Sequence, residues 1–207
     1  RPASVVKELV ENAIDAGAAR IEVALDKGGR ERIAVSDDGH GMGADDLALA
    51  VERHATSKLW SLDDLAAVTS LGFRGEALAS IAAAAHVRLV TRTAGAESAA
   101  FVELEGGVEL AQGTEAAAPG TSVHVEALFS TIPARLKFIR SASAETARIR
   151  GVVDHMAMAY PHVRFGLRSE ARTLVQTSGN GVLRDVMAAV YGAEVADSLI
   201  EVTGSVR

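Results

Sequence analysis

Three polar residues near the start of the chain, Glu8, Asn12 and Asp15, have the spacing of one side of a helix. Glu8 and Asn12 are four residues apart, so their side chains stack on one face, beside the apolar stripe of the same segment. A carboxylate and an amide arranged in this way can hold a water molecule and a metal ion. A solvated helix face without chemistry is the alternative, and the segments that follow favour the chemical interpretation.

An acidic, glycine-rich loop follows the next apolar strand. Asp37 ends that strand, and glycines stand at positions 39, 41 and 43. The loop fits a relaxed form of the dinucleotide-binding pattern, but Asp37 and Asp38 at its mouth would repel phosphates. A carboxylate there suits a hydrogen-bond donor such as the exocyclic amine of a purine, and the glycines would let the base approach the backbone. The sequence lacks the glycine-lysine run of a P-loop, which excludes a P-loop nucleotidase.

Two later segments could bind phosphate groups. The run Gly72-Phe73-Arg74-Gly75-Glu76 precedes an alanine-rich helix and offers free backbone N–H groups at a helix N-terminus. Residues 53–58 offer hydroxyl groups and cations. Each segment alone is also compatible with an ordinary loop, so the prediction of a phosphate site depends on their combination with the segments above.

The composition excludes several classes of protein. With 48% hydrophobic and 23% charged residues, the 207-residue chain has the composition of a folded protein, of one domain or of one domain plus part of another. Its 21 Lys and Arg against 27 Asp and Glu exclude a histone-like protein, so any contact with nucleic acid needs a local basic patch. The absence of cysteine excludes disulfide scaffolds, Cys-ligated zinc and thiol nucleophiles. No apolar run reaches the roughly 18 residues of a membrane span.

Periodic apolar patterns predict the elements that must position these side chains. Helices are expected from Pro2 to a C-cap at Gly17 and at residues 45–53, 63–68, 77–85, 144–160 and 182–191. Strands are expected at residues 20–26, 32–37, 87–93, 99–105, 108–111, 122–127, 163–168, 173–177 and 199–202. This order predicts an α+β fold, a two-layer sandwich of a mostly antiparallel mixed sheet with helices on one face. Regular βαβ alternation is missing, which counts against a doubly wound parallel fold.

Taken in order, these segments resemble the ATP-site motifs of the MutL family of DNA mismatch repair proteins. The motifs are KELVENAIDAG at residues 7–17, DDGHGM at residues 37–42, residues 54–58, GFRGEAL at residues 72–78, GTSV at residues 120–123 and PAR at residues 133–135. DNA gyrase, the ninety-kilodalton heat-shock chaperone and histidine kinases share this GHKL or Bergerat-type ATP fold. GFRGEAL and the downstream PAR point to MutL itself, and the resemblance covers essentially the whole chain.

The resemblance implies roles for individual residues and two cofactors, ATP and Mg²⁺. Glu8 would be the general base that activates the attacking water, and Asn12 would be a ligand of Mg²⁺. Asp37 would bind the adenine amine with support from Thr121. The base would rest against Gly39, Gly41 and Met42. The remaining contacts with ATP would come from a mobile lid over the phosphates, formed by His54, Thr56, Ser57, Lys58, Gly72, Phe73, Arg74, Gly75, Glu76, Ala77 and Leu78.

The resemblance also implies a domain organisation. Residues 1–179 would form the GHKL-type ATP-binding domain, and residues 180–207 a linker and the truncated start of a second α/β domain like one found in ribosomal proteins. The family's N-terminal arm and most of its second domain are expected to be missing, so we expect weak or no hydrolysis from this stretch alone. Thr131 departs from the family pattern, which usually has Asn there.

The implied partners are those of mismatch repair. Binding of Mg-ATP would close the lid and drive formation of a homodimer, which would couple a MutS-type mismatch-recognition protein to repair on DNA. The expected location is the bacterial cytoplasm, on the nucleoid when DNA is bound, with no membrane contact. A type II topoisomerase-like ATPase region and a nucleotide-switched DNA-clamp scaffold with negligible turnover are the alternatives.

One stretch of this acidic chain is markedly basic. Between Ile132 and Gly151 a single acid, Glu145, stands among the cations Arg135, Lys137, Arg140, Arg148 and Arg150. The functional interpretation is a rim that contacts the phosphates of double- or single-stranded DNA independently of sequence and without base stacking. A solvated helix start is the alternative.

Overall fold

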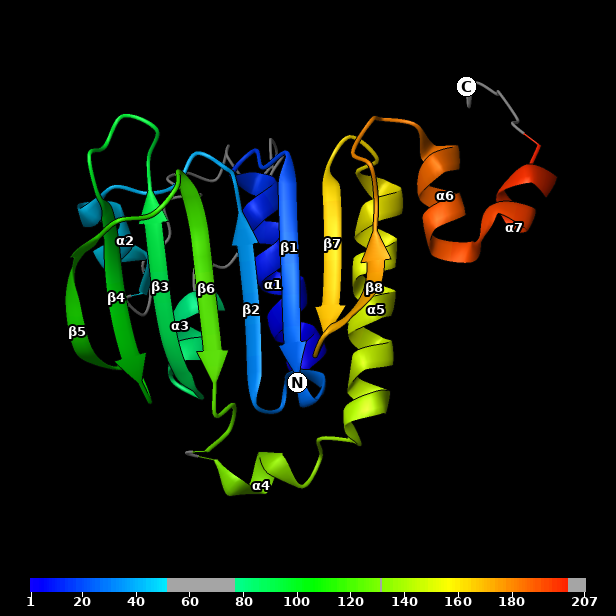
Figure 1. Ribbon diagram of the computed structural model, residues 1–207. Coiled ribbons are helices and arrows are strands. Elements are labelled where there is room, and N and C mark those ends of the chain that lie inside the picture. Colours follow the sequence, from blue (N-terminus) through cyan, green and yellow to red (C-terminus); the bar gives the residue numbers. More distant parts are fainter. Residues whose placement is uncertain (52–76, 131, 201–207) are drawn as a thin grey trace, which may run out of the picture.

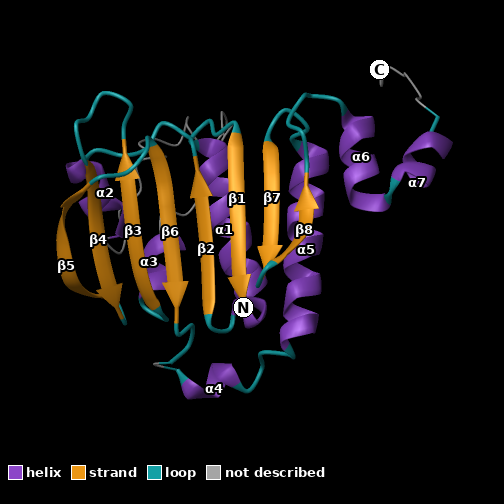
Figure 2. Ribbon diagram, viewed as in Figure 1, coloured by secondary structure: helices purple, strands orange, loops and turns teal. Residues whose placement is uncertain are grey.

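The computed structural model describes residues 1–51, 77–130 and 132–200. An eight-stranded sheet forms one layer, and helices that cover one of its faces form the other (Figures 1 and 2). The helical elements are α1 (Pro2–Asp15), η1 (Lys27–Gly29), α2 (Ala44–Val51), α3 (Ala77–Ala82), α4 (Pro133–Leu136), α5 (Ala142–Ala159), α6 (Leu183–Tyr191) and α7 (Ala193–Ser198). None of the helices in these described ranges is both long and apolar enough to cross a membrane.

The sheet is mixed and mostly antiparallel. Its strands are β1 (Arg20–Asp26), β2 (Arg32–Asp37), β3 (His86–Arg92), β4 (Ala99–Glu105), β5 (Val108–Glu115), β6 (Gly120–Glu126), β7 (Arg164–Ser169) and β8 (Arg172–Gln176). Their order across the sheet is β5-β4-β3-β6-β2-β1-β7-β8. Among these described strands, only β1 and β7 pair in parallel. The predicted α+β sandwich with helices on one face is therefore confirmed.

Helix α1 is fixed by an apolar stripe that faces the sheet. Val6, Val10 and Ala13 recur at helical spacing and are at most 1% exposed. Burying one Val side chain stabilises a fold by roughly 1.5–3 kcal/mol, so the stripe also fixes the rotation of α1 about its axis. The helix ends at Asp15, and its C-cap is Ala16, one residue before the predicted Gly17. Gly17 follows the cap with a φ of 72°, which lets the Ala18 N–H donate to the Ala13 carbonyl at 3.1 Å and ends the helix.

Helix α5 lies beside α1 on the same face of the sheet (Figure 1). Its residues Ile149, Val153 and Ala157 are fully buried, and they belong to the same core as Phe165 and Leu167 of β7. Because α1 and α5 pack on each other as well as on the sheet, neither helix can shift without opening the core.

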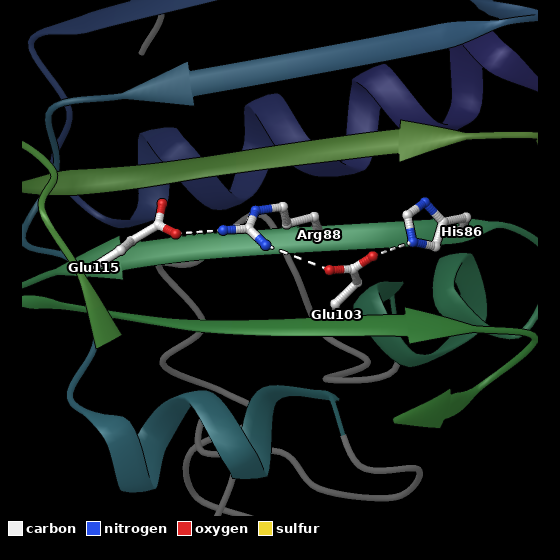
Figure 3. A network of polar contacts seen from close by, with 4 residues as sticks. All are labelled: His86, Arg88, Glu103 and Glu115. Carbon is white, nitrogen blue, oxygen red and sulfur yellow. Dashed lines mark hydrogen bonds and ion pairs between the residues drawn. The ribbon is translucent and has the colours of Figure 1, made fainter. Parts of the chain in front are cut away.

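The helix-free face of the sheet carries polar side chains. Figure 3 shows His86 and Arg88 of β3 with Glu103 of β4 and Glu115 of β5. His86 Nε2 lies 2.8 Å from a Glu103 oxygen, and Arg88 contacts both Glu103, at 3.4 Å, and Glu115. The Arg88 guanidinium also lies 4.4 Å from the centre of the Phe101 ring. The four polar groups link edge strand β5 to the middle of the sheet, so they have a structural role.

Two described segments depart from the sequence prediction. Strand β5 continues to Glu115, four residues beyond the expected end at Ala111. It is an edge strand, and seven of its eight residues are exposed. Because neither of its sides is buried, its sequence does not alternate between apolar and polar residues, which is the pattern used to predict where a strand ends. The short helix α4 was not expected. The helix predicted at residues 63–68 lies outside the described residues.

The C-terminal elements also differ in part from the prediction. Helix α6 confirms the helix expected there, and its Val186 and Val190 are buried in the main core. Helix α7 was not expected, and Leu199 and Ile200 form no strand, so the strand predicted at residues 199–202 is wrong in its described half. The domain boundary proposed after residue 179 stays a prediction.

Gly120, the first residue of β6, allows β6 to approach the end of β2. Its φ is 118°, and a Cβ atom there would lie 2.0 Å from the Asp37 carbonyl oxygen. Gly120→Ala should therefore lower the free energy of unfolding by about 1–3 kcal/mol through backbone strain and steric conflict, as measured by urea denaturation. Gly95 is the matched control, since a Cβ there meets no atom within 4 Å. Equal stability of Gly120→Ala and Gly95→Ala would contradict this account.

Candidate nucleotide-binding site

The loop after β2 is held against the end of α1 and against β3. The His40 N–H donates to the Ala16 carbonyl at 3.0 Å. A Cβ atom on Gly39 would lie 2.8 Å from Ala16 Cβ, and one on Gly41 would lie 2.2 Å from the Arg92 carbonyl oxygen. Only glycine fits at these two positions, so the glycines predicted to face a base also serve the packing of the loop itself.

The contact of His40 with Ala16 places the loop at the C-terminal end of α1, the helix that contains Glu8 and Asn12. Asn12 and Glu8 lie one and two turns before Ala16, roughly 6 and 12 Å along the helix axis. Both side chains are half-buried. Glu8 and Asn12 thus lie on a helix whose C-terminal end contacts the Asp37–Met42 loop. In the sequence, the β1–β2 hairpin separates this helix from the loop.

The acids of α1 differ in their surroundings. Glu11 is 6% exposed, and both its oxygens lie 2.6 Å from the Lys7 ammonium group. Within the described parts of the chain, the side chains of Glu8 and Asn12 have no hydrogen-bond or ion-pair partner. Glu8 is therefore a partly buried carboxylate that no described residue neutralises, whereas Glu11 is paired with Lys7.

Asp37 is a partly buried acceptor at the end of β2. One carboxylate oxygen accepts the Gly39 N–H at 2.9 Å, and Asp37 lies opposite Thr121 in the β2–β6 ladder. Burial raises the pKa of the Asp37 carboxyl, and the backbone N–H groups of Gly39 and Thr121 oppose that shift. Asp38 differs, because its exposed carboxylate accepts the N–H groups of Ala19 and Arg20, each at 2.8 Å. Asp38 thus supports the backbone, and Asp37 is the acid of this pair that the sequence analysis predicts to bind a ligand.

Thr91 is a site residue that the sequence analysis missed. Its hydroxyl oxygen accepts the Met42 N–H at 2.9 Å and lies 3.0 Å from the Thr121 hydroxyl, and the residue is 1% exposed. Thr91 thereby links the loop after β2 to β3 and β6. A threonine at an inward-facing position of an apolar strand is a weak signal, because only the neighbouring strands reveal its partners.

Most of the predicted lid lies outside the described residues: His54, Thr56, Ser57, Lys58, Gly72, Phe73, Arg74, Gly75 and Glu76. Ala77 and Leu78 open α3, where both are half-buried and Leu78 packs against the core. A separate hollow of about 660 Å³ lies between α2 and strands β4 and β5, with Leu47, Val102 and Leu104 in its lining. Its lining includes none of the predicted nucleotide residues.

The donor set in the described ranges does not form a metal cage by itself. No group of three or more His, Asp or Glu side chains is gathered there in a way that could hold a metal ion. A cation at Asn12 would therefore take most of its ligands from a bound molecule or from water. Mg²⁺ accepts such a site, since it usually keeps several waters and binds substrate phosphates.

A known ATPase family matches this region of the chain. The sequence profile of the histidine kinase-, DNA gyrase B- and HSP90-like ATPases matches residues 1–123, which hold α1, the Asp37 loop and Thr121. The chain belongs to this ATPase family.

The curated relatives that the chain matches are DNA mismatch repair proteins. The chain is 50% identical over 202 residues to the DNA mismatch repair protein MutL of Desulforudis audaxviator, and covers 36% of that protein. It is 46% identical over 204 residues to the MutL of Limosilactobacillus fermentum, and covers 31% of it. The matches include 98% and 99% of this chain. The chain thus spans about a third of the length of these relatives.

Solved structures of MutL ATPase domains share the fold. The ATPase domain of Aquifex aeolicus MutL complexed with ADP superposes with a TM-score of 0.78 at 28% identity, over 92% of this chain and 68% of the other. The N-terminal domain of a DNA repair protein gives the same TM-score and identity, over 56% of its own length. The sheet order and helix layer described above are thus those of a MutL ATPase domain.

The structure divides the basic residues between Ile132 and Gly151 into two groups. Arg150 lies 3.5 Å from Asp154 and donates to the Val190 carbonyl at 3.3 Å, so it joins α5 to α6. Arg148 lies 3.8 Å from the buried Glu145. Two of the five predicted DNA-binding cations are therefore already paired with groups of the protein itself.

The remaining cations, Arg135, Lys137 and Arg140, are exposed on and after α4. Phe138 is 70% exposed among them. An accessible ring therefore accompanies the charges, and DNA contact without base stacking stays a prediction. The signal was present in the sequence as an aromatic residue directly after Lys137.

The desolvated carboxylate of Asp37 yields a prediction that separates binding from stability. Asp37→Asn keeps the shape but replaces one acceptor oxygen with a donor, so affinity for ATP should fall by about 1–3 kcal/mol in calorimetry. The raised folded-state pKa means that Asp37 favours the fold at low pH and that this contribution is lost as pH rises through that pKa. At pH 7 the variant should therefore be at least as stable as wild type in thermal melts. Equal ATP affinity of the two proteins would contradict the assignment of Asp37.

Proposed function

We propose that this chain binds Mg-ATP and hydrolyses it as the ATPase region of a MutL-like DNA mismatch repair protein. The observation that carries the proposal is the half-buried Asp37 carboxylate at the end of β2. It accepts the Gly39 N–H and lies opposite Thr121, and the loop that follows it contacts the end of α1. A partly desolvated acceptor next to tightly packed glycines suits a flat base that bears an amine. Membership of an ATPase family supports the same ligand.

In the proposed complex, Asp37 accepts a hydrogen bond from the exocyclic amine of adenine. The Thr91–Thr121 pair holds the Met42 backbone in place and so shapes the wall on which the base rests. Gly39 and Gly41 let the loop pack closely against Ala16 and Arg92, because any side chain at these positions would displace the loop from them. The site thus discriminates by hydrogen bonding to the base edge as well as by shape.

Asn12 and Glu8 act on the phosphate end of the nucleotide. The side-chain oxygen of Asn12 would hold Mg²⁺, which when bound supplies positive charge to the phosphates. Glu8, one turn earlier, accepts the proton of the attacking water and orients it. Its half-buried position and its lack of a partner within the described residues support this role, whereas the carboxylate of Glu11 is occupied by Lys7.

The wider functional cycle is proposed from the family resemblance of the sequence motifs. Residues 54–58 and 72–78 would close over the phosphates, and closure would favour a homodimer that contacts DNA and a MutS-type protein in the bacterial cytoplasm. Relatives named as DNA mismatch repair proteins favour this cycle over that of a type II topoisomerase. A scaffold with negligible turnover differs from the proposal only in its hydrolysis rate, so kinetics must separate the two.

The role of Glu8 is tested by Glu8→Ala in a chain extended to the length of the curated relatives. Hydrolysis should slow by roughly 10²- to 10⁴-fold with ATP binding nearly intact, because a positioned base contributes to the chemical step only. Single-turnover kinetics and calorimetry measure the two quantities. Glu31→Ala removes an exposed acid from the β1–β2 turn and serves as the control. Wild-type turnover in Glu8→Ala would remove Glu8 from its role.

The role of Asn12 has a distinct signature. Asn12→Ala should weaken ATP binding when Mg²⁺ is present and leave it unchanged when a chelator has removed the metal, because the side chain would contact the nucleotide through the cation. Calorimetry with and without Mg²⁺ is the measurement. A loss of affinity that is equal in both conditions would show that Asn12 contacts the nucleotide directly or supports the fold.

The exposed cations define a test of DNA contact. Replacing Lys137 and Arg140 with Glu should weaken DNA binding uniformly across sequences and flatten its log–log salt dependence by nearly two units, the value for about two lost phosphate contacts. Replacing Arg168 and Arg172, exposed residues at the β7–β8 edge, gives a control with the same change in charge. If a salt titration gives equal slopes for wild type and the Lys137 and Arg140 variant, DNA binds elsewhere.

A further inference from the structure

Strand β5 is an open edge of the sheet. It stands at one end of the strand order, and among the described strands it pairs only with β4 (Figure 1). Seven of its eight residues are exposed. The backbone N–H and C=O groups on its outer side therefore face no strand in the described parts of the chain, and a strand of another molecule can bond with them.

Strand β5 lacks most of the features by which proteins protect a sheet edge. It is eight residues long and contains no Lys, Arg or Pro. Leu110 has no partner in the ladder with β4, but the pairing is regular from Ala111 to Glu115. This regular stretch is the part of the edge to which a further strand can be added over several consecutive residues.

The opposite edge of the sheet is better protected. Strand β8 has only five residues, begins with Arg172, and packs against helices α5 and α6. A short edge strand with a cation and a helical cover is poorly suited to pairing with another chain. Of the two edges, β5 is therefore the one that is open to a partner, and β8 provides an internal comparison.

An apolar hollow lies beside the regular stretch of β5. It has a volume of about 660 Å³ and lies between α2 and strands β4 and β5. Gln112 and Thr114 line it from β5, since they pair with Val102 and Ala100, which pack in the core. Leu47 of α2 lines it from the other side. A strand added to β5 would direct every second side chain to this side of the sheet, where the hollow can hold an apolar one.

The charge around the open edge favours a cationic partner. Glu105 and Glu109, at the start of the β4–β5 hairpin, are exposed and form no ion pair within the described residues. Pairing of β5 with the same strand of a second copy would gather two such sets of acids along one seam, which like-charge repulsion opposes. An extended segment that carries Lys or Arg would instead be attracted to this edge.

We propose that β5 binds an extended, cationic segment of a protein partner by strand addition, with an apolar side chain of that segment in the hollow between α2 and β5. Main-chain hydrogen bonds to residues 111–115 would supply affinity, and the hollow would select apolar side chains at alternate positions. This interaction goes beyond the proposed ATPase function, because none of the predicted nucleotide residues lines the hollow.

The probe is a peptide with the sequence Lys-Leu-Thr-Leu-Thr-Leu-Lys, blocked at both ends, whose leucines fall on one face of a strand. Calorimetry should show that it binds the chain extended to the length of the curated relatives. Replacing both lysines with Glu, or the central leucine with Pro, should weaken binding by about tenfold or more, because proline lacks the N–H that a strand donates. Equal affinity for the three peptides, or no binding of the first, overturns the proposal.

The position of the added strand is tested by Gln112→Lys. A cation on the hollow side of β5 should weaken binding of the lysine peptide by about tenfold or more. Gln176→Lys is the matched control, because Gln176 is an exposed residue of the other edge strand, β8, and its replacement should leave the affinity unchanged. Both variants should fold, since both side chains are exposed. Equal affinity of Gln112→Lys and wild type overturns the proposal.

The hollow is tested by Ala48→Trp. Ala48 is exposed and lines the hollow from α2, so an indole ring there should fill the space and weaken peptide binding by about tenfold or more. Leu49→Trp places the same ring on the same helix outside the lining, and should leave binding unchanged. Equal affinities of Ala48→Trp and Leu49→Trp would show that no side chain of the peptide enters the hollow, and would overturn the proposal.

Two further readouts identify the occupant and separate this inference from ATP hydrolysis. Amide hydrogen exchange should slow at residues 111–115 when the peptide is bound and stay unchanged at residues 172–176, and unchanged exchange at residues 111–115 overturns the proposal. If Gln112→Lys shifts the peptide-free protein toward the monomer in analytical ultracentrifugation, β5 pairs with a second copy, which also overturns it. Glu8→Ala should bind the peptide like wild type, so the two proposals fail independently.

Discussion

The burial of one apolar stripe of α1 is the interaction on which the rest of the structure depends. Val6, Val10 and Ala13 fix the rotation of α1 against the sheet and against α5. Glu8 and Asn12, on the same helix, are thereby held half-buried beside the core, where a carboxylate and an amide can act on a ligand. A helix of this length is marginally stable alone in water, so the core and not helix propensity sets the geometry of the site.

Close backbone approach is the second constraint, and it explains why glycine stands where it does. The loop after β2 contacts Ala16 at Gly39 and the Arg92 carbonyl at Gly41, and β6 meets the Asp37 carbonyl at Gly120. These contacts remove freedom from the loop that carries Asp37. They also withdraw its carboxylate from water, which raises its pKa and strengthens hydrogen bonds made there. The same packing therefore gives both rigidity and binding chemistry.

The charged groups of the molecule divide into those used by the fold and those left for partners. Glu11, Asp38, Glu103, Arg88 and Arg150 are held by neighbours inside the protein. Glu145 belongs with them, since it is buried and one of its oxygens accepts the Arg140 N–H. Arg135, Lys137 and Arg140 remain exposed with Phe138, so the surface available to a polyanion is smaller and less purely cationic than the sequence implies.

The sequence by itself determined the elements and the chemical types at the site. Periodic patterns indicated α1, its end next to Gly17 and the antiparallel strands, because period and turn chemistry are local properties of the chain. It also supplied Glu8, Asn12 and Asp37 as candidates through the spacing of their motifs. Only the tertiary structure decided that Thr91 joins Met42 to Thr121, that Arg148 and Arg150 are occupied within the protein, and that the lone acid of the basic stretch is buried. The Thr91 contacts and the Arg150 contact with Val190 join residues 30 or more positions apart, and the burial of Glu145 depends on the core, so no local pattern encodes them. The ion pairs of Arg148 with Glu145 and of Arg150 with Asp154 are local, since they join residues three and four positions apart on one helix.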